Sequence, residues 1–216
     1  MKQALIIFFS FIFLLFVQAC SNTTPTLPAS KPAPITHPKS PAPITLDKTY
    51  FKNKLVTKVD NEKGVITIST VNGFHKKPRR KTQTWANNFI TAFIDQKAGN
   101  ISYQINSLVQ YKDHDKHLYK EVSYNTGTEQ KTEESSILKH DISCLGSAYS
   151  GCMHTEHTAF SIDSTLIENM AASYTDGSQN KWRYTLSPRK GPNYSAYLFI
   201  AEIAALVEVA LEYQAD

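Results

Sequence analysis

Seven of the ten prolines in this 216-residue chain fall between residues 21 and 46. Proline fixes φ and has no amide hydrogen, so a segment this rich in proline forms neither helix nor sheet and favours extended polyproline II. A short repeat, Pro-Ala-Pro-Ile-Thr, begins at Pro32 and again at Pro41. The segment predicts a spacer, which we favour over a ligand for a proline-binding partner. The folded structure must therefore come from residues 47–216.

An apolar run precedes the spacer. Lys2 is followed by the run from Ala4 to Phe16, which is drawn almost wholly from Ile, Phe, Leu and Ala. A positive charge before an apolar segment of this length is typical of a secretory signal. A membrane-spanning helix needs about 20 apolar residues, more than this run provides. We therefore expect residues 1–19 to be a signal peptide that is removed.

The end of the apolar run reads Val17-Gln18-Ala19-Cys20. It resembles the lipobox of bacterial lipoproteins, in which an aliphatic residue stands three positions before a cysteine and a small residue stands directly before it. The resemblance implies cleavage before Cys20 and fatty acylation, for example by palmitate, of its sulfur and of the new amino terminus. Two or more acyl chains give stable membrane anchoring. Ser21, in place of Asp, implies the outer membrane in Gram-negative members. The alternative is an ordinary signal that releases a soluble protein.

The charged residues are unevenly distributed. Three of the 23 basic residues and none of the 19 acidic ones precede Asp47, so residues 47–216 hold 20 bases and 19 acids. A nearly neutral domain argues against a general nucleic-acid binder, which needs many phosphate contacts. The length of this part suits one domain. We expect a signal peptide at 1–19, a lipidated cysteine and proline-rich tether at 20–46, and one globular domain at 47–216.

Several segments carry the pattern of β-strands. Residues 64–71 alternate and are rich in β-branched side chains. Residues 88–95 and 101–111 flank Gly99-Asn100, and since Gly and Asn tolerate positive φ, the two segments predict a hairpin. The first of them also has helical spacing, which leaves a helix as the alternative. Further strands are expected at 118–124, at about 136–144, at about 157–162 and at 182–186.

Two helices interrupt the strands. A short one is expected near 164–172, capped by Asp163-Ser164-Thr165, and Thr165 and Glu168 have the spacing of a capping box. The second lies at the C-terminal end, where apolar residues recur from Ile203 to Leu211 at positions 0, 3, 4, 7 and 8. Three acids fall mostly on its other face: Glu202, Glu208 and Glu212. This pattern predicts an amphipathic helix whose apolar stripe packs on a sheet.

These elements together define the expected fold class. We predict an α+β domain in which an antiparallel sheet of about six to seven strands carries a short helix near 164–172 and a C-terminal amphipathic helix packed on the sheet.

Cys144 and Cys152 remain when Cys20 is lipidated. They lie eight residues apart across a segment that contains glycine, and in an oxidising compartment we expect them to form a disulfide. Closing so short a loop contributes about 2.5 kcal/mol in the chain-entropy account. A reactive or metal-binding pair is the alternative, although the Cys-x-x-Cys spacing of such pairs is missing.

Two pairs of histidines are candidate metal ligands. His154 and His157 would share one face of a helix and could bind zinc with a nearby carboxylate, but on a strand they would point to opposite faces. His114 and His117 lie in a very polar stretch and could supply further ligands. The competing interpretation is that all four are polar loop and strand-edge residues. No other cofactor is expected.

A cluster of cations lies in an expected loop and comprises Lys76, Lys77, Arg79, Arg80 and Lys81. Such a cluster could bind anionic lipid headgroups, lipopolysaccharide phosphates or an acidic partner. A solvated loop with no partner is the simpler interpretation.

No motif for a nucleophile elbow, a zinc protease, a phosphate-binding loop or a dinucleotide site occurs in the sequence. We expect a lipid-anchored protein of the bacterial envelope, at the outer membrane and facing the periplasm or the surface. Its domain would be a non-enzymatic binding module for an envelope protein or an anionic envelope component. The alternatives are a zinc hydrolase acting on envelope material through the four histidines, and a carrier of anionic ligands that uses the basic loop.

Overall fold

The computed structural model describes residues 44–73, 85–144 and 151–215, all within a compact unit that begins at Pro43. The expected signal peptide, the lipobox and the basic loop lie outside the described residues. The described helices are α1 (Lys48–Lys52), α2 (Ser164–Ala172) and α3 (Ile200–Ala215). The described strands are β1 (Val56–Asp60), β2 (Val65–Ser69), β3 (Trp85–Asp95), β4 (Asn100–Asp113), β5 (Tyr119–Asn125), β6 (Gln130–Glu134), β7 (Ser136–Ser143), β8 (Cys152–Ile162), β9 (Lys181–Pro188) and β10 (Tyr194–Phe199).

The first sheet is antiparallel and has the strand order β1-β2-β3-β4-β8-β7. Its longest hairpin, β3 with β4, is the one predicted around Gly99-Asn100, and Gly99 has a φ of 69°. In this register Ile90 lies opposite Ile105, and both side chains are fully buried. The alternation in the sequence therefore separates the face of the hairpin that meets the core from the face that does not.

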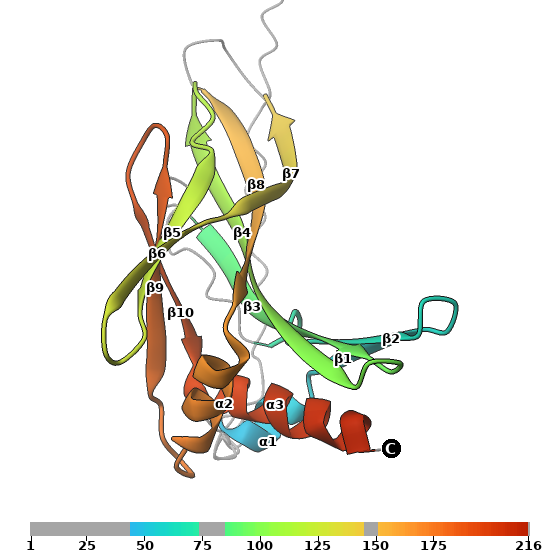
Figure 1. Ribbon diagram of the computed structural model, residues 1–216. Helices are drawn as coiled ribbons and strands as arrows, with labels where there is room; N and C mark the ends of the chain where they lie inside the picture. The colour runs from blue at the N-terminus through green and yellow to red at the C-terminus, as the bar shows by residue number, and fades with distance from the viewer. Residues whose placement is uncertain (1–43, 74–84, 145–150, 216) are drawn as a thin grey trace, which may run out of the picture. The chain divides into compact units, whose positions relative to one another are not determined.

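The second sheet is antiparallel with the order β10-β9-β5-β6. The chain enters it between β4 and β5 (Figure 1). The predicted α+β class, with a C-terminal helix packed on a sheet, is confirmed. The sequence predicts one sheet, whereas the described residues form two. Strands such as β6 escaped prediction because they are polar throughout and leave no apolar alternation to detect.

Side chains of both sheets and of α3 meet in one hydrophobic core. The ring of Tyr124 in β5 stacks on Phe160 of β8, with 6.0 Å between centroids. Phe160 in turn meets Tyr184 of β9 at 5.5 Å. Ile203 and Leu206 of α3 are fully buried in the same cluster. The two sheets are therefore held together by aromatic contacts as well as by the helix.

Helix α3 is buried almost all round, because α1 and α2 pack against it in addition to the sheets (Figure 1). The prediction that Glu202 faces solvent is wrong: its side chain is 3% exposed and accepts a hydrogen bond from Oγ1 of Thr70 at 2.5 Å. Leu211, which was expected in the apolar stripe, is 45% exposed. In the described ranges no helix has the length and hydrophobicity needed to cross a bilayer.

Helix α2 has the predicted range, and its N-cap lies in the predicted capping segment Asp163-Ser164-Thr165. Asp163 is the N-cap residue, and its carboxylate accepts a hydrogen bond from the backbone N–H of Leu166 at 3.0 Å. Thr165 lies inside the first turn of the helix. The predicted capping box of Thr165 and Glu168 is therefore wrong, because Asp163, two residues before Thr165, already supplies the acceptor.

Strand β7 is the outer strand of the first sheet next to β8. Its register shifts between Ile137 and Lys139, which marks a β-bulge. Lys139 forms an ion pair with Asp141 at 2.8 Å. Ile142, farther along the strand, is 48% exposed. The end of this strand leads directly to Cys144 and thus to the candidate site.

Candidate functional site at the crossover between the sheets

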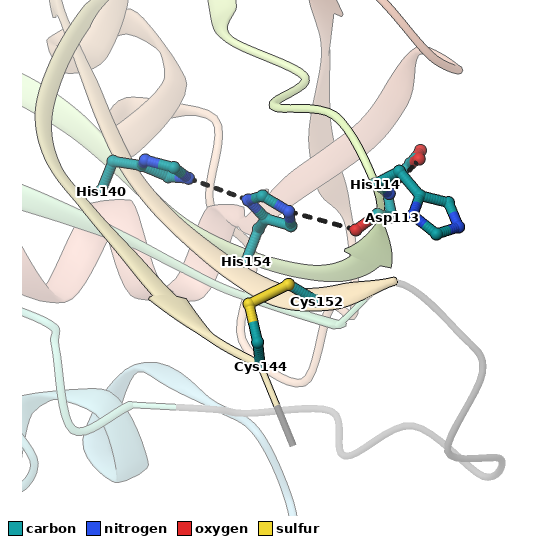
Figure 2. The surroundings of a disulfide bond; sticks show 6 residues. All are labelled: Asp113, His114, His140, Cys144, Cys152 and His154. Carbon is teal, nitrogen blue, oxygen red and sulfur yellow. Dashed lines mark hydrogen bonds between the residues drawn. A yellow bond between two sulfur atoms is a disulfide. The ribbon is translucent and has the colours of Figure 1, made fainter. Parts of the chain in front are cut away.

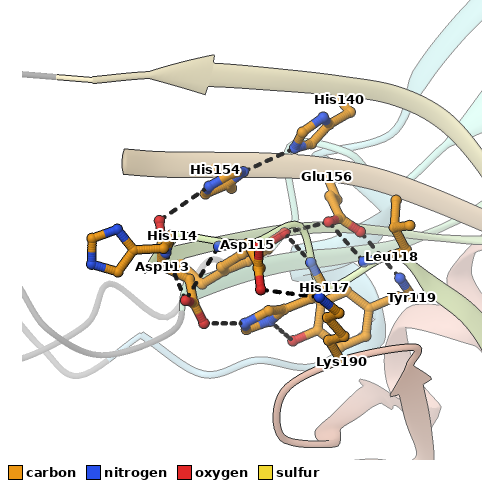
Figure 3. Close-up of polar contacts among 11 residues, drawn as sticks. Asp113, His114, Asp115, His117, Leu118, Tyr119, His140, His154, Glu156 and Lys190 are labelled. Atoms are coloured by element: carbon orange, nitrogen blue, oxygen red, sulfur yellow. Dashed lines mark hydrogen bonds and ion pairs between the residues drawn. The ribbon is translucent and has the colours of Figure 1, made fainter. Parts of the chain in front are cut away.

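The chain crosses from the first sheet to the second between Asp113, which ends β4, and Tyr119, which begins β5. Leu118 in this crossover has a φ of 56°, the one positive φ of a non-glycine residue in the described ranges. A leucine in this conformation is strained and persists only where surrounding contacts hold it. Those contacts come from what we call the crossover cluster: Tyr111, Asp113, His117, Tyr119, His140, His154 and Glu156. Figure 3 labels all of these residues except Tyr111.

Glu156 lies at the centre of the crossover cluster and is 0% exposed. Its carboxylate accepts hydrogen bonds from the backbone N–H groups of Leu118 at 3.0 Å and Tyr119 at 3.1 Å. A third hydrogen bond comes from the hydroxyl of Tyr111. A buried carboxylate is tolerated when hydrogen bonds replace its lost hydration. Glu156, on β8 of the first sheet, therefore holds the start of β5 in the second.

The ring of Tyr111 lies between two histidines. His117 stacks on it with 3.7 Å between centroids and 4° between planes, and His154 does so at 5.1 Å and 3°. The hydroxyl of Tyr111 also accepts a hydrogen bond from the backbone N–H of His117 at 2.8 Å. Burial raises the pKa of Tyr111 above its usual range, so the phenol stays protonated and donates to Glu156.

His117 is 4% exposed and both of its ring nitrogens are engaged. Nε2 lies 2.9 Å from Oδ2 of Asp113, and Nδ1 lies 3.1 Å from the hydroxyl of Tyr119. The hydrogen bond from His117 lowers the pKa of Asp113. The loop after β9 closes over the same ring, because a Cβ placed at Gly191 would lie 2.7 Å from Nε2 of His117.

His154 is 2% exposed and connects β7 with the end of β4 (Figure 2). Its Nε2 lies 3.2 Å from the carbonyl oxygen of Asp113, and its Nδ1 lies 3.1 Å from Nε2 of His140. A carbonyl can only accept, so Nε2 of His154 carries the hydrogen and, in the neutral ring, Nδ1 accepts from His140. Burial lowers the pKa of His140.

The four predicted metal ligands do not meet at one point. Strand β8 begins at Cys152, before the predicted strand, so His154 and His157 both lie in it and point to opposite faces. His157 bonds to Oδ1 of Asn106 at 3.1 Å, and burial lowers its pKa. His114 is exposed. His117 and His154 do come together, but with Tyr111 between their rings.

No arrangement that could hold a metal ion is formed by three or more His, Cys, Asp or Glu side chains within the described part of the chain. The imidazole nitrogens of His117 and His154 are already used in hydrogen bonds. A metal ion at either ring would have to replace one of these bonds. As it stands, the crossover cluster is suited to fixing the backbone of the crossover.

Cys144 and Cys152 form the disulfide expected from the sequence, with an S–S distance of 1.98 Å (Figure 2). It joins the segment after β7 to the first residue of β8. Beside it lies a cleft of about 600 Å³ that we call the disulfide cleft, lined by His114, Asp115, Lys116, Leu118, Ile142, Cys144, Cys152, His154, Arg189 and Lys190. The disulfide cleft and the crossover cluster share His154, and the cleft is also lined by Leu118, whose backbone N–H donates to Glu156 of the cluster.

Sequence reasoning found the histidines and cysteines of this region but missed Tyr111, Glu156 and the cations of the cleft. One signal for Glu156 was present: it lies an even number of residues from Phe160 and Ile162 on β8, so all three side chains point to the same face of the strand, and both Phe160 and Ile162 are buried. The predicted anion-binding residues at 76–81 lie outside the described residues.

Comparison of the chain with family models, with curated proteins and with solved structures gave no match in any of the three.

Proposed function

We propose that this chain is a lipid-anchored protein of the bacterial envelope whose domain is a non-enzymatic binding module. The lipobox-like ending at Cys20 and the proline-rich spacer support the anchor. The disulfide between Cys144 and Cys152 supports export, because stable disulfides are typical of oxidising compartments. The outer membrane is the proposed location, from Ser21 and the lipoprotein resemblance.

The observation that carries the binding role is that the crossover cluster is satisfied by its own hydrogen bonds. Glu156 has three donors, and the rings of His117 and His154 use both nitrogens. His154 lines the disulfide cleft, so its hydrogen bonds fix part of the wall, and a ring whose two nitrogens are engaged does not present a free base to the cleft. A cleft with fixed walls favours recognition of a ligand.

The anchor is tested by expressing the full-length chain in a Gram-negative host, separating the membranes and measuring the mass of the N-terminal peptide. We expect the protein in the membrane fraction, beginning at an acylated Cys20. Cys20→Ser should remove both properties. The control Ser21→Asp should keep the acylation and shift the protein towards the inner membrane. An unmodified Cys20 in a soluble protein would contradict the proposal.

A zinc hydrolase is the second candidate function. One observation favours it: two of the four predicted ligands, His117 and His154, stack on the same ring of Tyr111 although they come from segments that lie far apart in the sequence. Elemental analysis of the purified full-length protein, without an affinity His tag, tests it. Stoichiometric zinc that is lost on His154→Ala would support the hydrolase, and metal-free protein would leave the binding module as the surviving proposal.

A further inference from the structure

Part of the lining of the disulfide cleft is apolar. Leu118, Ile142 and the disulfide contribute to its lining, and Ile142 is 48% exposed although it is a large aliphatic side chain. An exposed aliphatic side chain in a concave surface favours a ligand with an apolar part.

Three cations also line the disulfide cleft. Lys116, Arg189 and Lys190 line the cleft together with a single carboxylate, Asp115. Asp115 and Lys190 form an ion pair at 3.2 Å, which leaves two cations without a matching acid among the lining residues. The neighbouring hollow along β5, β6 and β9 shares Arg189 with the cleft but differs in charge, since its lining includes three glutamates. The disulfide cleft is therefore the one of these two that suits an anion carrying two negative charges.

The backbone that carries two of the cations is attached to the crossover. The N–H of Arg189 donates to the carbonyl of His117 at 2.9 Å, and the N–H of Lys190 donates to the same carbonyl at 3.3 Å. His117 is in turn held by Tyr111, Asp113 and Tyr119. The cations therefore project from a fixed backbone, which lowers the entropic cost of gathering them around a ligand.

We propose that the disulfide cleft binds a phosphoryl group carried on an apolar moiety. The proposal deepens the proposed function and rests on it, since it names the ligand class of the binding module. A phosphomonoester offers two negative charges and three strong acceptor oxygens, which match clustered Lys and Arg donors, while its apolar part covers Leu118 and Ile142. Its source is either a membrane lipid headgroup or a soluble phosphomonoester.

The test uses the full-length lipoprotein in nanodiscs of phosphatidylcholine, titrated calorimetrically with phenyl phosphate, inorganic phosphate and phenol. We expect phenyl phosphate to bind best, inorganic phosphate to bind more weakly and phenol not to bind. Arg189→Ala and Lys116→Ala should each weaken phenyl phosphate binding about tenfold, the effect of one charge-assisted contact. Asp115→Asn should strengthen it, because Lys190 is then released from its acid. Added salt should weaken binding.

Lys58→Ala is the matched control, because Lys58 is an exposed lysine on β1 and does not line the cleft. Phenyl phosphate binding that is absent, or that falls equally in Lys58→Ala and Arg189→Ala, would overturn the proposal. Repeating the titration with phosphatidic acid in the nanodiscs separates the two sources. If the cleft binds a lipid headgroup, phosphatidic acid competes and weakens the binding of phenyl phosphate. If it binds a soluble phosphomonoester, the binding of phenyl phosphate is unchanged.

The membrane fraction of each variant is measured in parallel. An anchored, folded protein that does not bind phenyl phosphate refutes the ligand class alone. A protein that binds phenyl phosphate but is released unacylated refutes the anchor alone.

Discussion

Two buried glutamates, one in the crossover cluster and one in α3, differ in the hydrogen bonds that they accept. Glu156 in the crossover cluster is 0% exposed and accepts three hydrogen bonds, two of them from the backbone of the crossover. Glu202 in the first turn of α3 is 3% exposed and accepts from Thr70 and from the backbone N–H of Phe199. Burial raises the pKa of Glu202 to about 8.

The difference lies in what each acid holds in place. Glu156 joins the first sheet to a strained leucine and the first residue of the second sheet. Glu202 lies among helices and sheet that also meet through apolar contacts. Burial alone therefore does not show what an acid holds in place; the number of its donors, and whether they come from a strained segment, does.

The largest expected effect is that of Glu156→Ala. Three buried donors lose their acceptor, and at about 1 kcal/mol or more for each we expect a loss of about 4 kcal/mol in the free energy of unfolding. Urea unfolding followed by circular dichroism measures it. Glu156→Gln, which keeps one acceptor oxygen, should lose about half as much. If Glu202→Ala proved as damaging as Glu156→Ala, the comparison between the two regions would fail.

A second change breaks the crossover cluster from outside. Gly191→Ala places a methyl group 2.7 Å from Nε2 of His117 at a φ of 91°, so we expect a loss of about 3 kcal/mol from steric conflict and backbone strain together. Gly177→Ala is the control: its φ is 76°, but nothing lies within 4 Å of the new methyl, and about 1 kcal/mol is expected. Equal losses in thermal unfolding would show that the loop does not clamp His117.

A third change, at Glu202, sharpens the comparison through the pH dependence of the free energy of unfolding. The folded pKa of Glu202 is about 8 against an ordinary 4.5, so between these values the folded state holds a proton that the unfolded state has released. The free energy of unfolding therefore falls as pH rises through this window. Glu202→Gln should remove this dependence and be more stable than the wild type at pH 8, with little change near pH 4.5. Parallel pH slopes of wild type and variant in urea unfolding would contradict the assignment.

The smallest expected effect concerns His140. Burial lowers its pKa, so the unfolded state binds a proton before the folded state does, and the free energy of unfolding falls as pH drops below the ordinary value of 6.5. His140→Gln keeps a donor for Nδ1 of His154 and should show a shallower loss of stability between pH 6.5 and 5. The measurement is the thermal midpoint across this range, and an unchanged slope would mean that another group controls acid unfolding.

The sequence allowed the regular parts of this fold to be predicted. Apolar alternation around Gly99-Asn100 located the β3–β4 hairpin, and the recurrence from Ile203 located α3. It did not reveal β1, where Thr57, Lys58 and Val59 are all exposed, because such a strand is held by its partner and not by a buried face. Glu202 was misplaced because a helix covered on nearly every side does not show an outward face.

The candidate site could be predicted only in part. Histidines and cysteines are conspicuous in a sequence, so His154 and the pair of Cys144 and Cys152 were found. Tyr111 and Glu156 look like ordinary strand residues until the register places Tyr111 opposite His154. The cations of the cleft come from two loops, after β4 and after β9, and their meeting depends on the topology of the second sheet.

The bulge in β7 has a consequence for the lipid anchor that we propose, which would crowd copies of the chain on one membrane. Chains tethered side by side meet one another at high effective concentration, where the open edge of a sheet invites a neighbouring strand to add to it. The register shift between Ile137 and Lys139, together with the charged pair of Lys139 and Asp141, interrupts the flat edge that such addition requires. The same strand can thus carry an exposed Ile142 into the cleft without offering the rest of its edge to aggregation.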